Sequence, residues 1–264
     1  MHCQKTYSLV LAIAMVLTSR NDRAHVPSDK NSATAVNTAP QTSKVEAKSA
    51  SSVTPLMIAV GGNDEARVRN LLASGANPDD PSGSRSPLIL AITTFRPSEK
   101  PALVCNVGIV RALLEHGADP NRPDPATGTL PLLAAFDVGD MSCARIIRSA
   151  GGRAEGHDQS GRTILICAVG AASRSRNTQI LDLAISWGSG PNERTGGGAT
   201  ALHEAVRVNS PEVARALLAR GANPCIRNDL GQTPLDMANN LKRSPALIEV
   251  LRPVTRCAGN ELSK

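Results

Sequence analysis

The sequence predicts an all-α fold, a solenoid of about six stacked helix–turn–helix repeats with hairpin loops. Two observations predict it. First, a six-residue motif recurs after residue 53, and its successive copies start 32, 44, 33, 37 and 33 residues apart. Second, aromatic residues make up only 2% of the chain, whereas Ala, Leu and Val are frequent. Small apolar residues suit thin, repeated layers better than a core packed around large rings.

The first 19 residues are typical of a secretory signal peptide. Lys5 precedes an apolar run of 11 residues, 7–17, which is shorter than the ~17–25 residues that cross a bilayer. Cleavage is expected after Thr18 or Ser19. The alternative is that the run forms an apolar first helix of the folded domain. Export predicts a periplasmic or secreted protein, with no membrane insertion after the signal is removed.

Residues 20–52 are polar, rich in Ser, Thr, Ala, Asn and Lys, and show no apolar period. Such a segment buries too little surface to offset the entropy of ordering, so we expect a disordered linker. The net charge of the whole chain is +6. After residue 53 the two signs are interspersed, without the basic stripe that nucleic-acid binding requires. The scarcity of aromatic residues argues against a stacking groove as well.

Each copy of the repeated motif predicts a first helix. A Thr or Ser at its start caps the helix, and the Pro that often follows fits the first turn. The Leu and Ala residues after it face the neighbouring layer. The six copies start at Thr54, Ser86, Leu130, Thr163, Thr200 and Thr233.

A second motif, Leu-Leu-x-x-Gly-Ala followed by Asn-Pro or Asp-Pro, predicts the end of a second helix in each repeat. Its best copies lie at 71–78, 113–120 and 217–224. The Gly supplies the left-handed residue that ends a helix. The Asn, Asp, Pro and Gly residues beyond it turn the chain back toward the next repeat.

With both motifs in phase, the sequence resembles the ankyrin-repeat family over about residues 53–256. The resemblance implies L-shaped repeats, each a helix pair with a hairpin loop. It also implies protein binding through the hairpin tips and the first helices. We therefore expect an ankyrin-repeat domain at 53–258, with six repeats, and a C-terminal tail at 259–264.

Departures from the family pattern lie mainly in the third and fourth repeats. The family's His occurs only as His203, where we expect a structural, capping role. The third repeat lacks the second Leu, at 147–152, and the fourth reads Ala-Ile-Ser-Trp-Gly at 184–188. These two repeats are expected to be the least stable layers.

Two insertions lengthen the repeats. Ten extra residues fall around 94–105 in the second repeat, and four fall around 173–178 in the fourth. Insertions in solenoids often loop out from one face and contribute to binding. Neutral drift in a tolerant loop is the alternative.

Six cysteines are present, and Cys3 leaves with the signal peptide. Alignment of the repeats places Cys225 and Cys257 at nearly the same position in adjacent layers. It also brings Cys105, at the end of the first insertion, near Cys143. In an oxidising compartment we expect disulfides Cys105–Cys143 and Cys225–Cys257. Cys167 would remain a free, mostly buried thiol. The alternative is that all five are small core residues.

The sequence predicts no catalytic group, no cofactor and no metal site, because no nucleophile, phosphate loop or ligand spacing accompanies the histidines and cysteines. Trp187 is expected to be exposed, and Arg174, Arg176 and Arg207 to form a small basic patch. The candidate partner-binding residues are mostly charged and mostly at hairpin tips: Asp79, Asp80, Arg122, Asp124, His157, Asp158, Trp187, Glu193, Arg194, Arg207, Arg227 and Asp229.

Taken together, these features predict a monomeric, non-catalytic protein-binding module. Three roles are compatible with the sequence: an exported scaffold or regulator of an envelope protein, an immunity protein that neutralises a secreted toxin, and a host-directed secreted effector. The sequence does not identify the partner, because the same framework serves all partners.

Overall fold

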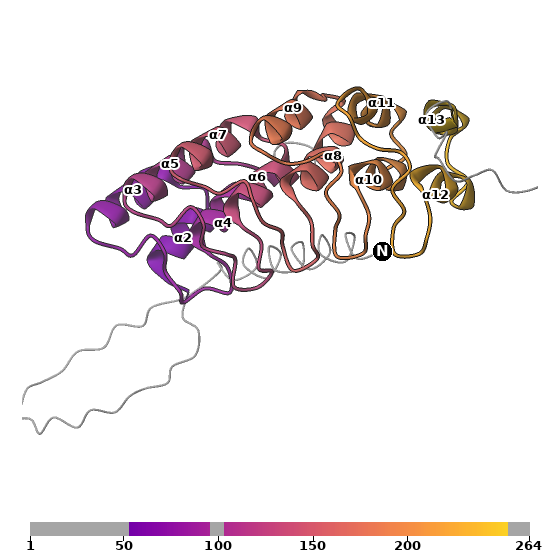
Figure 1. The fold of residues 1–264 in the computed structure, drawn as a ribbon. Helices are drawn as coiled ribbons and strands as arrows, with labels where there is room; N and C mark the ends of the chain where they lie inside the picture. The colour runs from indigo at the N-terminus through magenta and orange to yellow at the C-terminus, as the bar shows by residue number, and fades with distance from the viewer. Residues whose placement is uncertain (1–52, 96–102, 253–264) are drawn as a thin grey trace, which may run out of the picture. The chain divides into compact units, whose positions relative to one another are not determined.

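A computed structural model describes residues 53–95 and 103–252 of the chain. The predicted signal peptide and the whole of the predicted linker lie outside the described residues, as do the tail and the last residues of the predicted domain. The described residues form six pairs of antiparallel helices stacked in sequence order (Figure 1). This confirms the predicted ankyrin-type stack.

The helices form two rows, and Figure 1 shows the loops between repeats projecting beyond the row of first helices. The first helices of the six repeats are α2 (Pro55–Gly61), α4 (Pro87–Ile92), α6 (Pro131–Val138), α8 (Ile164–Ser175), α10 (Ala201–Arg207) and α12 (Pro234–Asn240). The second helices are α3 (Glu65–Ala73), α5 (Val107–Glu115), α7 (Met141–Ser149), α9 (Gln179–Ser186), α11 (Pro211–Ala219) and α13 (Pro245–Leu251).

Caps at the helix ends explain why the repeated motifs work. The Thr54 hydroxyl accepts the backbone N–H of Met57, and the Ser86 hydroxyl accepts that of Ile89. Each bond satisfies a donor that has no partner inside the helix. At the other end, Gly117 has φ +91° after α5, a conformation that residues with a Cβ rarely adopt.

The core runs through the whole stack between the two rows. It consists mostly of Leu, Ile, Val and Ala, and its largest fully buried side chain is Phe136. Each layer packs against its neighbours, so the stack is held together by contacts that are close in sequence. No helix within the described residues combines the length and apolar character needed to cross a membrane.

The two insertions take different forms. The first contains a short antiparallel ladder between β1 (Thr94–Phe95) and β2 (Leu103–Val104), a detail that the all-α prediction missed. The second does not loop out. Its residues extend α8 to 12 residues, and the helix ends at Arg176 with φ +54°. The expectation of a loop at 173–178 was therefore wrong for most of this insertion, because the extra residues continue the helical hydrogen bonding.

Candidate protein-binding face

The row of first helices and the loops that project beyond it form the candidate binding face. Four residues after its capping residue, each first helix places a side chain whose exposure varies along the stack. Ile58 in α2 is 54% exposed, whereas the equivalent Cys167 in α8 is only 2% exposed. At this position the face therefore exposes an apolar side chain at its N-terminal end and buries the equivalent side chain in its middle.

An ion-pair cluster lies beside the buried thiol in the middle. Arg162, in the loop before α8, donates from Nε to Asp158 Oδ2 at 2.8 Å. Its Nη1 lies 3.7 Å from Asp137 Oδ1, at the end of α6. Burial raises the pKa of the Cys167 thiol well above its usual range, so this thiol is neutral and unreactive.

Two of the predicted binding residues, Asp124 and Asp158, are buried inside their own loops, so the expectation that they contact a partner was wrong. The Asp158 carboxylate accepts the backbone N–H groups of Ser160 and Arg162 at 2.9 and 3.0 Å. The Asp124 carboxylate accepts the backbone N–H of Ser86 at 3.2 Å. The Asp124 carboxylate thus ties its hairpin to the capping residue of α4, whereas the Asp158 carboxylate closes its own turn before α8.

Asp79 and Asp80 are half-buried and tie the first two repeats together. Asp79 Oδ2 accepts the backbone N–H of Asp119 at 2.9 Å. Asp80 accepts the hydroxyl of Thr54 and the backbone N–H of Ser82. Burial alone would raise the pKa of Asp80, but these hydrogen bonds lower it below its usual value. The carboxylate oxygens of Asp79 and Asp80 are thus largely engaged in hydrogen bonds within the protein.

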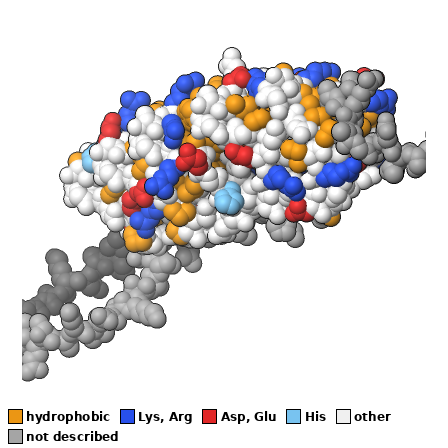
Figure 2. All heavy atoms as spheres, in the orientation of Figure 1, with side chains coloured by type: hydrophobic (Ala, Val, Ile, Leu, Met, Phe, Trp, Pro, Cys, Tyr) orange, Lys and Arg blue, Asp and Glu red, His pale blue; other side chains and the backbone are white. Residues whose placement is uncertain are grey.

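The other charged tips stay candidates for contact with a partner. Within this set Arg194 pairs with Asp229, at 3.1 Å across two neighbouring loops. Arg227 lies 3.4 Å from Asp236 in α12. The full set comprises Arg122, which is half-buried, and the exposed His157, Glu193, Arg194, Arg227 and Asp229. Figure 2 shows acidic, basic and apolar side chains interspersed on one face of the stack.

Trp187 is partly buried, so the expectation that it is exposed was wrong. It follows α9 directly and packs against the core, with its ring edge-on to that of Phe136 at 5.6 Å between centroids. The predicted basic patch is also engaged within the protein. Arg174 donates to the backbone carbonyl of Asp137, and Arg207 donates to Glu204.

The sequence analysis missed two apolar candidates on exposed loops and helix ends. Leu230, at the tip of the loop before α12, is 80% exposed, and Leu241, at the end of α12, is 46% exposed. The signal for Leu230 was present in Asn-Asp-Leu-Gly, a turn sequence with one large apolar residue. At this turn no neighbouring layer covers an apolar side chain, so Leu230 stays exposed.

The single family-pattern histidine has the expected structural role. His203 Nδ1 lies 3.2 Å from the backbone nitrogen of Thr200, which donates to it. His203 Nε2 lies 2.9 Å from the carbonyl oxygen of Gln232, in the next repeat. Burial lowers the pKa of this histidine, so a neutral ring links the two layers.

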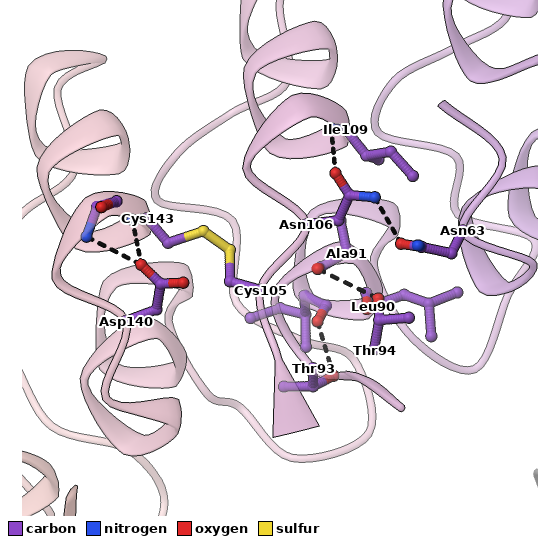
Figure 3. The surroundings of a disulfide bond; sticks show 12 residues. Asn63, Leu90, Ala91, Thr93, Thr94, Cys105, Asn106, Ile109, Asp140 and Cys143 are labelled. Carbon is purple, nitrogen blue, oxygen red and sulfur yellow. Dashed lines mark hydrogen bonds between the residues drawn. A yellow bond between two sulfur atoms is a disulfide. The ribbon is translucent and has the colours of Figure 1, made fainter. Parts of the chain in front are cut away.

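A disulfide joins Cys105 to Cys143 in the structure, with the two Cα atoms 6.5 Å apart (Figure 3). It links the end of the first insertion to α7. The carboxylate of Asp140 lies close enough that one of its oxygens and both sulfurs fall within 4.8 Å of one another. Sequence spacing did not indicate this grouping, because its members come from two repeats. Cys257 lies outside the described residues, so the Cys225–Cys257 pair stays a prediction.

Comparison with known proteins agrees with this architecture. The ankyrin repeat family model matches residues 53–82, 85–125 and 197–229. The crystal structure of EF0377, an ankyrin repeat protein, superimposes with a TM-score of 0.60 at 21% identity, covering 76% of this chain and 98% of that one. The chain contains ankyrin repeats.

Curated relatives match over parts of their length. Cyclin-dependent kinase inhibitor 2A from Monodelphis domestica is 33% identical over 96 residues, which is 36% of this chain and 50% of that protein. Ankyrin repeat and SOCS box protein 18 from Homo sapiens is 30% identical over 144 residues, 46% of this chain and 31% of that protein. The chain thus covers half or less of both relatives.

The ankyrin repeats imply a protein–protein interaction module, and the fold is typically a non-catalytic binding scaffold. The family model matches the first, second and fifth repeats. The third and fourth repeats, where the sequence departs from the family pattern, nevertheless form complete helix pairs in the stack.

Proposed function

We propose that this chain is an exported, non-catalytic protein-binding module that scaffolds or regulates an envelope protein. The observation that carries the proposal is the row of six first helices, flanked by hairpin loops whose tips expose both charged and apolar side chains. The apolar run at 7–17 and the disulfide between Cys105 and Cys143 support export.

The two ends of the binding face offer the apolar contacts that a partner would bury. Ile58 lies on α2, and Leu230 lies at the last hairpin tip. Covering a large apolar side chain with a partner removes its surface from water, which favours association. The ion pairs and hydrogen bonds between loops fix the loops relative to one another, which lowers the entropy lost on binding.

The experiment is affinity capture. Residues 20–264 are immobilised on a support, which is then incubated with an extract of the exported compartment. Ile58→Asp and Leu230→Asp test the binding face. Arg145→Glu and Arg215→Glu, on the exposed sides of α7 and α11, serve as controls on the second row. We expect one stoichiometric partner, lost with the first pair of variants and retained with the second.

The identity of the captured protein separates the proposed role from its alternatives. An enzyme or structural protein of the envelope supports the scaffold role. Capture of a secreted toxin would instead support the role of an immunity protein. Equal capture by all four variants would contradict the proposed face. Retention of nothing from the producing cell would contradict the envelope role and favour a foreign toxin or a host target.

A further inference from the structure

We propose that Cys105, Cys143 and Asp140 form a metal site when the disulfide is reduced, so that metal binding and disulfide formation exclude each other. Two sulfurs and one carboxylate oxygen lie within 4.8 Å of one another. Two thiolates and a carboxylate suit a borderline-soft divalent cation, of which Zn²⁺ is the natural example. Nothing in the proposed binding role requires this site.

Each cysteine lies at or just before the start of its own nine-residue helix. Cys105 comes directly before Asn106, the capping residue of α5, and Cys143 is the third residue of α7. The dipole at a helix N-terminus stabilises negative charge, so it favours the thiolate form that binds metal. Figure 3 shows the two side chains approaching from separate elements.

Asp140 is held in a fixed orientation. Its Oδ1 accepts the backbone N–H groups of Ser142 and Cys143 at 2.9 and 3.0 Å. Within the described part of the chain, no group donates a hydrogen bond to Oδ2, and no Lys or Arg forms an ion pair with this carboxylate. One oxygen therefore orients the side chain, and the other is available as a ligand, as in established metal sites.

Charge and burial explain why the two buried cysteines give up their thiol protons only when a cation is bound. Cys105 and Cys143 are 4% and 0% exposed. Two buried thiolates beside a carboxylate would repel one another and lose their hydration. A covalent S–S bond removes the two sulfur charges, and a divalent cation neutralises them. The disulfide and the metal complex each use both sulfurs, so one protein molecule cannot hold both.

The backbone leaves room for either state. The Cα–Cα separation of 6.5 Å lies near the upper end of the ~4.4–6.8 Å range of disulfides. Small rotations of the cysteine side chains would part the sulfurs enough for Zn–S bonds of about 2.3 Å. Three protein ligands leave a fourth tetrahedral position for water.

The chemistry balances with a dithiol reductant of the thioredoxin class. The reductant gives two electrons and two protons to the S–S bond and becomes a disulfide itself, leaving two protein thiols. Metal binding then releases two thiol protons. In the reverse direction, glutathione disulfide takes two electrons from the two thiolates, which form the S–S bond. The metal leaves, and two glutathione thiolates take up two protons.

The test uses the full chain, reduced with a phosphine and then exposed to Co²⁺ and to Zn²⁺. We expect the reduced protein to show the thiolate-to-cobalt charge-transfer absorption and to retain about one Zn²⁺ per chain against a chromogenic chelator. Oxidation with glutathione disulfide should release the metal. This comparison needs no variant, so it does not depend on whether a mutant folds.

Matched variants assign the ligands. Asp140→Asn keeps a good capping residue while replacing the carboxylate, and should weaken Zn²⁺ binding at least ~10-fold. Asp64→Asn makes the same change at the cap of α3, whose carboxylate is not among the three candidate ligands, and should change nothing. Cys105→Ala with Cys143→Ala reports uptake by the other thiols. Equal uptake by wild type and this double variant, equal affinity before and after oxidation, or no effect of Asp140→Asn would overturn the three-ligand site.

Discussion

The third repeat, in the middle of the stack, and the first two repeats, which match the family model, differ in how their first helices begin. In the first and second repeats, Thr54 and Ser86 cap the first helices with hydrogen bonds. In the third repeat, Leu130 occupies that place and makes no side-chain cap. Yet six of the eight residues of α6 are buried. A first helix can therefore lose the side-chain cap of the family pattern and still be well packed in its layer.

Position in the stack explains the difference. The third and fourth repeats have a neighbouring layer on each side, and α8 buries eight of its residues. In α2, at the N-terminal end, only four residues are buried. This distribution of buried surface argues against the expectation that the two divergent repeats are the least stable layers.

The largest expected effect breaks the packed middle. Phe136→Ala removes the largest fully buried side chain and its contact with Trp187, and should lower the free energy of unfolding by about 3–5 kcal/mol. Ile58→Ala, at the exposed end, should change it by no more than ~0.5 kcal/mol. Urea denaturation measures both. Similar losses for the two variants would show that packing does not distinguish the two regions.

Reduction of the Cys105–Cys143 disulfide tests how strongly the second repeat is joined to the divergent third. The two cysteines are 38 residues apart, so loop closure predicts a loss of about 4 kcal/mol in the unfolding free energy. The measurement compares oxidised and reduced protein in urea, with a chelator present to remove metal. An unchanged midpoint, or five free thiols in protein taken from the oxidising compartment, would exclude the bond.

Asp158 and Asp229 sharpen the distinction between structural and available loop carboxylates. Asp158→Ala leaves Arg162 and two backbone N–H groups without their acceptor and should cost about 2–3 kcal/mol. Asp229→Ala removes an exposed pair with Arg194 and should cost less than ~1 kcal/mol. Thermal and urea unfolding should rank the two in that order. The opposite order would show that the hydrogen bonds of Asp158 do not stabilise its loop.

The smallest effect concerns the link between the fifth and sixth repeats. Burial holds the pKa of His203 below that of an exposed histidine. As the pH falls, this histidine therefore binds a proton in the unfolded chain before it does so in the folded chain. Stability should therefore fall as the pH drops below ~6.5. His203→Gln should lose less stability between pH 7.5 and 5.5 than wild type does. Parallel pH profiles for the two proteins would contradict this origin.

The periodic part of the fold could be predicted from the sequence, because caps and left-handed glycines are local. Thr54 and Gly117 act through backbone groups only a few residues away, so their motifs carry enough information. The proximity of Cys105 and Cys143 was also accessible, since alignment of repeats converts sequence position into place in the stack.

The rest depended on neighbouring layers. Asp124 and Asp158 look like ordinary loop carboxylates, and only the packing of the next helix start reveals that they are buried. Trp187 occupies a position that is polar in other repeats, and its contact with Phe136 comes from a different layer. Asp140 escaped notice as a ligand because its capping role is complete in itself.

The disulfide has a mechanical consequence for a chain pulled from its ends. A bond that closes 38 residues withholds from extension a contour length of about 130 Å, at ~3.3–3.6 Å per stretched residue. The oxidised stack would thus unravel to a shorter end-to-end length than the reduced one. A partner that pulls on the module would therefore be unable to extend the segment that the disulfide closes between the second and third repeats. That segment would become extensible only when the disulfide is reduced.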